Sequence, residues 1–436
     1  MISRNIDEQI QLWSDMYRMN DNAYHSFKAD NEGLGMISLA AAVRNYSGRL
    51  IEALAGDYPV VWHNLTFNPE ILYAMDIVPL CVQLLPALFG FTQQLNIVME
   101  LIDFAESLGV PSDLCSVDKL STAVMTKKLY PRPSCHLCIN APCDSQVFAS
   151  QTMAEIEPAP QFFIDVPYYK DERTVKYVAE QFKELIPFLT QYTGKKFDLE
   201  KLRHTCELSN RMVENLWEWM EWRKHVPVVQ ASRLCQMGLY INILSSGSED
   251  GVIWTEGLKR EAKEKALRNK PIINERARGI WYQDAVAWDF FIYDWMESNL
   301  GLTIPMDVFG YYVNEGLIDT SSLDSMLYGL AKKNVIATPM ARQFMYNAEL
   351  FIQDFLKIVE DFHADCGIYA GHLGCKHGWG ATGLLREACH KANIPLLVFE
   401  FDMFDPRVIG QEELKIKLTQ FVEDMVLPRK QSKERR

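Results

Sequence analysis

The sequence lacks a long uninterrupted hydrophobic run. Its longest apolar stretch, residues 77–91, contains Gln83 and two prolines, and is too short and too broken to cross a bilayer. The amino terminus, MISRNIDEQIQLW, has no continuous apolar core of the kind that signal peptides carry. We therefore expect no membrane segment and a cytoplasmic location. The ten cysteines are then expected to be core fillers, redox groups or metal ligands rather than disulfides.

An excess of positive charge is also missing. The 44 Lys and Arg residues are outnumbered by 57 Asp and Glu residues, which gives a net charge of −13. A surface that neutralises phosphates is not expected, so nucleic acid is excluded as a general partner. The glycine-rich stretch GHLGCKHGWGATG, residues 371–383, fits neither the dinucleotide fingerprint nor the P-loop, whose final Gly-Lys-Ser/Thr it lacks. We expect no nucleotide site there.

What the sequence does contain is an alternation of short β-rich runs and helical segments, which predicts an α/β fold with two Rossmann-like parallel-sheet domains. A helical N-terminal region precedes the first domain, and a helical connector separates the two. The predicted strands are residues 59–62, 77–82, 134–140 and 162–166 in the first domain, and 279–282, 303–309, 366–370 and 395–401 in the second. The predicted boundaries are a helical region over 1–57, a first α/β domain over 58–197, a connector over 198–275, a second α/β domain over 276–428 and a frayed tail over 429–436.

Several helix ends follow from capping signals. Gly56 and Gly194 are expected stops, and Asp198 is an expected N-cap of the helix after it. The charged segment Ser248–Asn269 is expected to form a solvated helix.

The stretch PRPSCHLCINAPCDSQVF, residues 131–148, holds three cysteines within nine residues. The spacing C-x2-C-x4-C is not a standard zinc pattern, because a second close pair of Cys or His is missing. Iron-sulfur ligation suits it better, since clusters accept irregular spacings and distant ligands. The alternative is a buried strand that is rich in cysteine.

Topology separates the cysteines. In open α/β sheets, ligands bind beyond the carboxyl ends of the strands, where helix N-termini also point. Cys115, Cys143 and Cys375 each precede a predicted helix, which is expected to start near Lys119, at Ser145 or near Ala381. A helix N-terminus is expected to lower the pKa of a thiol, so these are the candidate metal ligands or nucleophiles.

The other seven cysteines are less well placed. If residues 134–140 form a strand, Cys138 lies about 16 Å and Cys135 about 26 Å from Cys143, so neither shares a cubane with it. Four further cysteines lie within apolar patterns and are expected to fill the core: Cys81, Cys206, Cys366 and Cys389. Cys235, whose segment has no assigned structure, is also interpreted as a core residue. Three thiolates are one fewer than a 4Fe-4S cluster usually has, and an iron without a protein ligand can bind water or a substrate oxygen.

Several stretches resemble the 2-hydroxyacyl-CoA dehydratase and benzoyl-CoA reductase family. They are DLCSVDKL, the strand ending in APCD, FFIDVPYYKDERTVKYVAEQFKELIPFLTQYTGKKFDLEKL, GHLGCK, and IPLLVFEFDMFDPRVIGQEELKIKLTQFVEDM. The resemblance covers residues 59–425 and is specific for the family but not for the substrate. The helical N-terminal region and the chain length are similar to those of the larger subunits of the family, those of benzoyl-CoA reductase included.

The resemblance implies a 4Fe-4S cluster between the two domains, with Cys115, Cys143 and Cys375 as its ligands. It also implies a heterodimer with a second subunit of the same family, and an ATP-hydrolysing iron-sulfur activator that delivers single electrons. The substrate is then a CoA thioester. Dehydratases convert its carbonyl to a ketyl radical that expels the 2-hydroxyl group, whereas aryl-CoA reductases reduce the ring.

The sequence departs from the family at two positions. Active dehydratase subunits carry a serine after the strand that corresponds to PVVW and a glutamate further on; the nearest positions here are Leu65 or Thr66, and Gln83. Thr66 and Gln83 are therefore the catalytic candidates, although an amide cannot act as a carboxylate base. The alternative is a partner subunit that relays electrons or acts as a scaffold, with a cluster but no acyl-CoA site.

Other polar residues near the predicted strand ends allow two interpretations. His372 and His377 could tune a cluster or make structural hydrogen bonds, and Lys376 could meet a CoA phosphate or face solvent. The carboxylates Glu400, Asp402 and Asp405 are expected to cap the next segment and pair with Arg407.

Overall fold

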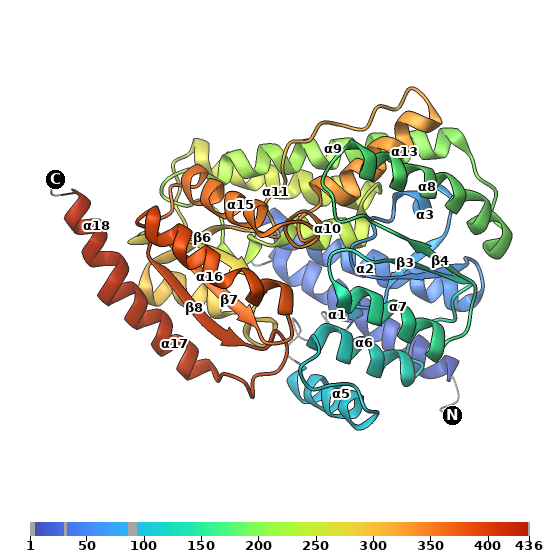
Figure 1. The fold of residues 1–436 in the computed structure, drawn as a ribbon, viewed down its shortest axis with the longest axis horizontal. Helices are drawn as coiled ribbons and strands as arrows, with labels where there is room; N and C mark the ends of the chain where they lie inside the picture. The colour runs from blue at the N-terminus through green and yellow to red at the C-terminus, as the bar shows by residue number, and fades with distance from the viewer. Residues whose placement is uncertain (1–4, 30–32, 86–93, 435–436) are drawn as a thin grey trace.

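The computed structural model describes residues 5–29, 33–85 and 94–434, and contains two parallel four-stranded sheets (Figure 1). The first has the order β2-β1-β3-β4 and the second the order β6-β5-β7-β8. The strands are β1 (Val60–His63), β2 (Val78–Cys81), β3 (Cys135–Ile139), β4 (Gln161–Ile164), β5 (Ala277–Gln283), β6 (Leu302–Asp307), β7 (Cys366–His372) and β8 (Leu396–Phe401). The predicted α/β fold with two parallel sheets is confirmed, and all eight predicted strands are present.

In each sheet the chain first builds outward on one side of its first strand and then continues on the other side. In the first, β1 pairs with β2 on one side and β3 on the other, with Trp62 opposite both Leu80 and His136. In the second, β5 takes the same place between β6 and β7. The six strands β1, β2, β3, β5, β6 and β7 are buried along their whole length, as expected of apolar parallel strands with helices on both faces.

Helices surround the two sheets. The N-terminal pair is α1 (Ile6–Ala29) and α2 (Leu34–Ala55). Around the first sheet lie α3 (Glu70–Ala74), α5 (Leu95–Ser107), α6 (Ser116–Thr126), α7 (Asp144–Ile156) and α8 (Glu172–Thr193). The connector holds α9 (Leu199–Arg223), α10 (Met237–Ser245) and α11 (Glu249–Leu267). The second half adds α12 (Ile292–Trp295), α13 (Leu323–Lys332), α14 (Ala341–Phe344), α15 (Ala348–Asp361), α16 (Lys376–Lys391), α17 (Gln411–Gln420) and α18 (Leu427–Glu434).

The predicted caps are confirmed. Gly56 ends α2 with φ 94° and Gly194 ends α8 with φ 72°, a left-handed conformation that glycine adopts without steric cost. The Asp198 side chain accepts hydrogen bonds from the Glu200 and Lys201 amides at the start of α9.

Several predicted helix ends and environments were wrong. The helix α6 begins at Ser116 rather than near Lys119, and α16 begins at Lys376 rather than near Ala381. The predicted solvated helix, α11, buries residues such as Trp254 and Leu258 against α2 and α9. The carboxyl-terminal segment, expected to fray from residue 429, remains helical to Glu434.

The connector holds the two sheets together. In Figure 1, α10 lies between them, with α9 and α11 running alongside. The Tyr73 hydroxyl, from the first domain, donates a hydrogen bond of 2.5 Å to the Leu244 carbonyl of α10. At the other end of α10, a Cβ at Gly238 would lie 3.1 Å from the Gly310 carbonyl oxygen of the second domain. The helix is therefore packed against both halves.

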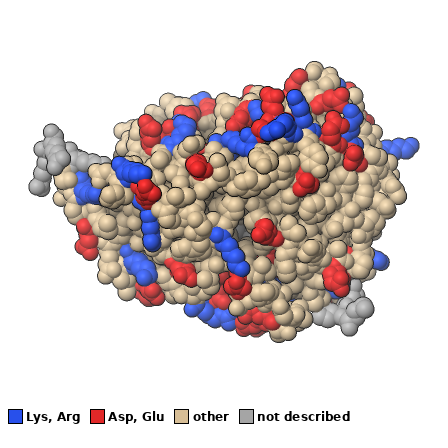
Figure 2. All heavy atoms as spheres, viewed as in Figure 1, with Lys and Arg blue, Asp and Glu red and all other residues tan. Residues whose placement is uncertain are grey.

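The surface charge and the hydropathy of the helices agree with what the sequence predicts. Acidic and basic side chains are interspersed over the face shown in Figure 2, which is hollowed near its centre. Within the described residues, no helix is both long and apolar enough to cross a membrane; residues 86–91 of the longest apolar run lie outside that part of the chain.

Candidate active site

One cavity of about 610 Å³ lies at the carboxyl ends of both sheets. Every strand is followed by at least one residue that lines it. These residues are Leu65 after β1, Gln83 after β2, Cys143 after β3, Tyr168 after β4, Asp284 after β5, Phe309 after β6, Cys375 after β7 and Met403 after β8. The strand order reverses at β1/β3 and at β5/β7, and such switch points are where ligands bind in doubly wound sheets. The two switch points share this one cavity.

The three cysteines selected by topology all line the cavity. Cys115 is the N-cap of α6, Cys143 the N-cap of α7 and Cys375 the N-cap of α16. The Gly378 amide donates a hydrogen bond of 3.4 Å to the Cys375 Sγ atom. The predicted positions at helix N-termini are thus confirmed, and the corrected helix starts place Cys115 and Cys375 closer to those termini than we expected.

A close contact joins the two domains beside these cysteines. Gly374 is pressed against the backbone of Cys115, because a Cβ at residue 374 would lie 2.5 Å from the Cys115 Cα and 2.6 Å from its nitrogen. Two residues further on, Lys376 Nζ lies 2.9 Å from Asp113 Oδ2. The loops that carry Cys115 and Cys375, 260 residues apart in the sequence (375 minus 115), therefore touch.

The expected lowering of the thiol pKa values was wrong. Burial raises the pKa of Cys143 to about 12 and that of Cys115 well above its ordinary value, and the nearby Asp118 carboxylate adds to both shifts. Burial and Asp284 likewise raise the pKa of Cys375. Desolvation of a thiolate outweighs the helix dipole at these three positions.

The remaining cysteines do not line the cavity. Cys135 and Cys138 lie in β3 and are fully buried, as expected of strand residues. The other five predicted fillers are buried as well: Cys81, Cys206, Cys235, Cys366 and Cys389.

Gln83 is part of a hydrogen-bond network around a buried carboxyl group. Its Nε2 donates to Asp118 Oδ1 at 2.6 Å, and its Oε1 accepts from the Leu65 amide at 2.6 Å. The Ser145 hydroxyl donates to the other oxygen of Asp118. Burial raises the pKa of Asp118 to about 6, and these two hydrogen bonds limit the rise. The amide at residue 83 therefore holds a carboxyl group that lines the cavity.

Thr66 and Leu65 have different surroundings. The Thr66 hydroxyl donates a hydrogen bond of 2.5 Å to the Ala141 carbonyl, and Thr66 does not line the cavity. Leu65 and Gln83 do line it. Of the two catalytic candidates, the structure brings only Gln83 to the cavity.

The second domain contributes a buried histidine near the Asp402 carboxylate. His372 Nδ1 accepts a hydrogen bond of 3.2 Å from the Met403 amide and lies 3.7 Å from Asp402 Oδ2. The neutral ring then carries its proton on Nε2, which has no hydrogen-bond partner among the described residues although His372 is only 1% exposed. Asp284 lies on the same side, and burial raises its pKa to about 6.

The other polar candidates have structural roles in the described chain. Lys376 is mostly exposed and pairs with Asp113, and the His377 ring packs edge-on against Phe344 with centroids 5.7 Å apart. Asp402 accepts hydrogen bonds from the Phe404 and Asp405 amides, and Asp405 pairs with Arg407 at 2.6 Å. The predicted capping and pairing are confirmed for these two; Glu400 is exposed in β8.

Sequence reasoning missed Asp118 and Asp284. Asp118 stands in the first turn of α6, where an acidic residue is usually read as a partner of the helix dipole. Its position one turn after Cys115 could have indicated that it lies at the site. Asp284 follows β5 directly, and the strand-end argument that selected the cysteines applies to it equally.

Comparison with known proteins gives a family match over most of the chain. Residues 64–425 match the family described as "2-hydroxyglutaryl-CoA dehydratase, D-component". The chain is 20% identical over 336 residues, 74% of its length and 80% of the relative, to the (R)-phenyllactyl-CoA dehydratase alpha subunit of Clostridium sporogenes. It is 25% identical over 177 residues, 37% of its length and 41% of the relative, to the (R)-2-hydroxyisocaproyl-CoA dehydratase alpha subunit of Clostridioides difficile.

A shorter match, 30% identical over 101 residues, covers 22% of the chain and 21% of the alpha subunit of (R)-2-hydroxyglutaryl-CoA dehydratase from Acidaminococcus fermentans. All three relatives are dehydratase subunits; the likeness in layout to benzoyl-CoA reductase stays a prediction. Because the family match spans most of the folded chain, both sheets and all three cavity cysteines, the protein belongs to the 2-hydroxyglutaryl-CoA dehydratase D-component family.

Proposed function

We propose that this chain is the cluster-bearing subunit of an ATP-activated (R)-2-hydroxyacyl-CoA dehydratase, and that Cys115, Cys143 and Cys375 hold a 4Fe-4S cluster. The observation that carries the proposal is the convergence of three thiols, each at a helix N-cap, on one cavity between two sheets. The other cysteines of the chain lie away from this cavity.

The residues present fit such a group. Cysteine thiolates are the usual ligands of iron-sulfur clusters. Among the described residues, no three Cys, His, Asp or Glu side chains lie where they could together hold one metal ion. The unpaired Nε2–H of His372 adds a buried donor on the cavity wall, where an acceptor on a bound group would satisfy it.

The cluster, when bound, supplies single electrons and an iron that can bind an oxygen atom. The chain's own residues do the rest. Asp118, held by Gln83 and Ser145, provides a carboxyl group beside Cys115 and Cys143. The apolar lining excludes water from the reacting group.

A partner subunit and a CoA-thioester substrate are part of the proposal. The relatives are named alpha subunits, which implies at least one further subunit in each of those enzymes. Their names include an aromatic, a dicarboxylic and a branched aliphatic acyl group, so the family leaves the acyl group of this protein open. We expect an ATP-dependent iron-sulfur activator to supply the electrons.

Iron analysis after strictly anaerobic purification tests the cluster. We expect about four irons and equivalent sulfide per chain. Cys143→Ala should lose that iron, whereas Cys138→Ala, a control in the same stretch that does not line the cavity, should retain it. An iron-free, stable wild-type protein, or equal iron in the two variants, would contradict the proposal.

A second function, electron relay without substrate, is favoured by one observation. The cavity has an amide at residue 83, and the nearby Thr66 hydroxyl is directed to the Ala141 carbonyl. A relay subunit would show an EPR signal that CoA thioesters leave unchanged. A dehydratase subunit should show a signal that shifts when the (R)-2-hydroxyacyl-CoA ester is added.

A further inference from the structure

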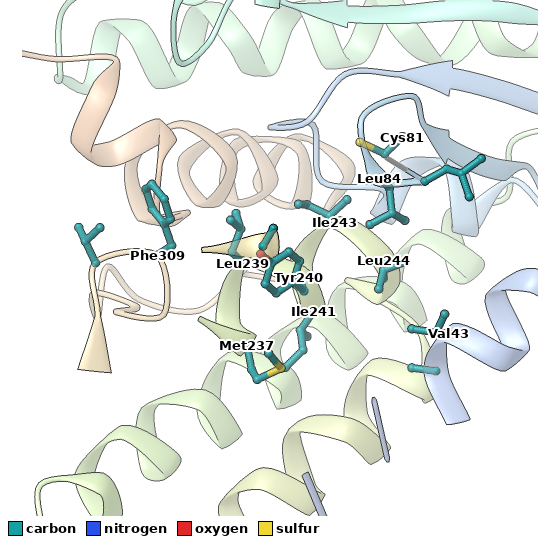
Figure 3. Packing of buried hydrophobic residues seen from close by; sticks show 14 of the residues in the cluster. Val43, Cys81, Leu84, Met237, Leu239, Tyr240, Ile241, Ile243, Leu244 and Phe309 are labelled. Carbon is teal, nitrogen blue, oxygen red and sulfur yellow. The ribbon is translucent and has the colours of Figure 1, made fainter. Parts of the chain in front are cut away.

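Much of the cavity wall is apolar and rich in aromatic residues. The helix α10 contributes Leu239, Tyr240 and Ile243, the first domain Leu84 and Phe148, and the second domain Phe309 and Phe344. Figure 3 shows the α10 side chains between Phe309 on one side and Leu84 on the other. Three parts of the chain thus build one apolar surface.

Methionines extend this surface. Met340, Met345 and Met403 line the same cavity. A thioether is unbranched and polarizable, so it adapts to irregular apolar groups and packs well against aromatic rings. A site built from aromatic rings and thioethers is suited to a hydrophobic ligand group.

The charged residues on the cavity wall are mostly acidic. Asp113, Asp118, Asp144 and Asp284 line it. Among the described lining residues, the only Lys or Arg is Lys376, whose side chain is 76% exposed and already paired with Asp113. A carboxylate on a bound acyl chain would meet no free cation there and would lie among other carboxylates, which is unfavourable in a buried site.

From this lining we infer that the acyl group of the substrate is uncharged and apolar, either aryl or branched aliphatic, and not a dicarboxylic acid. The inference rests on the proposed function for the CoA thioester and adds the class of its acyl group. The cavity volume of about 610 Å³ is within the usual range of small-molecule sites, about 300–1,000 Å³.

Binding of three CoA esters to the full-length chain, purified anaerobically, tests the inference by calorimetry. The esters are (R)-phenyllactyl-CoA, (R)-2-hydroxyisocaproyl-CoA and (R)-2-hydroxyglutaryl-CoA, which share the CoA moiety and differ in the acyl group. We expect at least one of the first two to bind about tenfold or more tighter than the glutaryl ester. The ratio between those two distinguishes an aryl from a branched aliphatic acyl group.

Equal binding of all three esters, or tighter binding of the glutaryl ester, overturns the acyl assignment alone. No binding of any ester overturns the proposed function, and the assignment with it. The two failures are therefore distinguishable in one experiment.

A substitution in the wall provides a second readout. Phe148 is half-buried in α7 and lines the cavity, so Phe148→Arg adds a cation to a wall whose only described Lys or Arg, Lys376, is paired with Asp113. We expect this variant to bind the two apolar esters about tenfold more weakly and the glutaryl ester about tenfold more tightly than the wild type does. The control is Phe163→Arg, on the exposed side of β4 and outside the cavity, which should change neither. An unchanged order of affinities in a folded Phe148→Arg variant contradicts the inference.

Discussion

Gln83 Nε2 donates a hydrogen bond of 2.6 Å to Asp118 Oδ1, so the amide at the position where the family resemblance led us to expect a glutamate holds a neighbouring carboxyl group. Both side chains are buried, at 1% exposure. The same amide accepts from the Leu65 backbone. Gln83 thus connects the segments that follow β1 and β2 with the start of α6, beside Cys115.

Replacing Gln83 by leucine should destabilise the fold. The variant removes the nearer of the two acceptors of the Leu65 amide, which keeps Gln146 Oε1 at 3.3 Å, and it leaves one oxygen of Asp118 without its partner. An unsatisfied buried group costs about 1–3 kcal/mol. Urea denaturation of the two proteins measures the difference. Gln420→Leu, an exposed change at the end of α17, is the control and should stay within about 0.5 kcal/mol of the wild type. Equal stability of Gln83→Leu and the wild type would disprove the structural role of this amide.

Lys333→Met should lower the stability of the fold more than Gln83→Leu does. Lys333 Nζ lies 2.6 Å from Glu70 Oε1, with both side chains buried, and it also donates to Ser209 and Ser246. Removing the cation leaves a buried carboxylate uncompensated, which costs about 3–5 kcal/mol. The exposed pair Lys183–Asp324 has a similar separation of 3.0 Å, and Lys183→Met should cost about 1 kcal/mol or less. Denaturation midpoints that fall equally in the two variants would contradict this.

The same ion pair gives an acid dependence with a defined sign. Burial alone would raise the pKa of Glu70, but the Lys333 ammonium and the hydrogen bonds around it lower that pKa below its ordinary value of 4.5. The pair therefore stabilises the fold above about pH 4.5, and the contribution is lost as the pH falls through the lowered folded-state pKa. The free energy of unfolding of Glu70→Gln and of the wild type is measured in urea at pH 7 and pH 4. The difference between the two proteins should be smaller at pH 4. A deficit that widens on acidification would show the opposite sign.

A histidine on β3 predicts a second loss of stability on acidification, in a higher pH range than that of Glu70. Burial lowers the pKa of His136 from 6.5 to about 4, and neither ring nitrogen has a hydrogen-bond partner in the described part of the chain. In the unfolded chain this histidine binds a proton below about pH 6.5, whereas in the folded chain it stays neutral down to about pH 4. The free energy of unfolding therefore falls as the pH is lowered across that window.

His136→Phe should flatten that dependence. The ring stacks on Trp62 with centroids 5.6 Å apart, and phenylalanine can keep that contact without a titrating group. Urea denaturation at pH 5 and pH 7 measures the slope, with His25→Phe, at an exposed position of helix α1, as the matched change. A slope equal to that of the wild type would mean that His136 is not a source of acid lability.

The strands were predictable because parallel strands covered on both faces have short apolar sequences, and Val60–His63 and Cys366–His372 show this pattern. The starts of α6 and α16 were harder. Cysteine is not a usual capping residue, and the first turns of α16, KHGWG, contain two glycines, which favour helix poorly. The helix α11 carries enough charge to look solvated, and only its packing against α2 and α9 shows that it is half core.

The candidate site was predictable as far as strand topology extends. The rule that ligands bind beyond strand ends selected Cys115, Cys143 and Cys375, and all three line one cavity. The hydrogen bond between Gln83 and Asp118 was not predictable, because it joins residues 35 positions apart whose pairing depends on how α6 packs beside β2. The thiol pKa values also depend on burial, which a local sequence pattern does not define.

Gly374→Ala should disturb the contact between the two domains at the cysteine cavity. The added methyl group would lie 2.5 Å from the Cys115 Cα, and because the neighbour is backbone, the loop that carries Cys375 must shift. We expect a lower melting temperature and, given the proposed cluster, less iron per chain after anaerobic purification. Gly380→Ala, in the helix α16 that follows this loop and with no atom within 4 Å of the added methyl group, is the matched control. It should keep its iron and gain about 0.5–1 kcal/mol from the better helix propensity of alanine. Full iron and an unchanged melting temperature in Gly374→Ala would show that the two loops can separate without loss of the site.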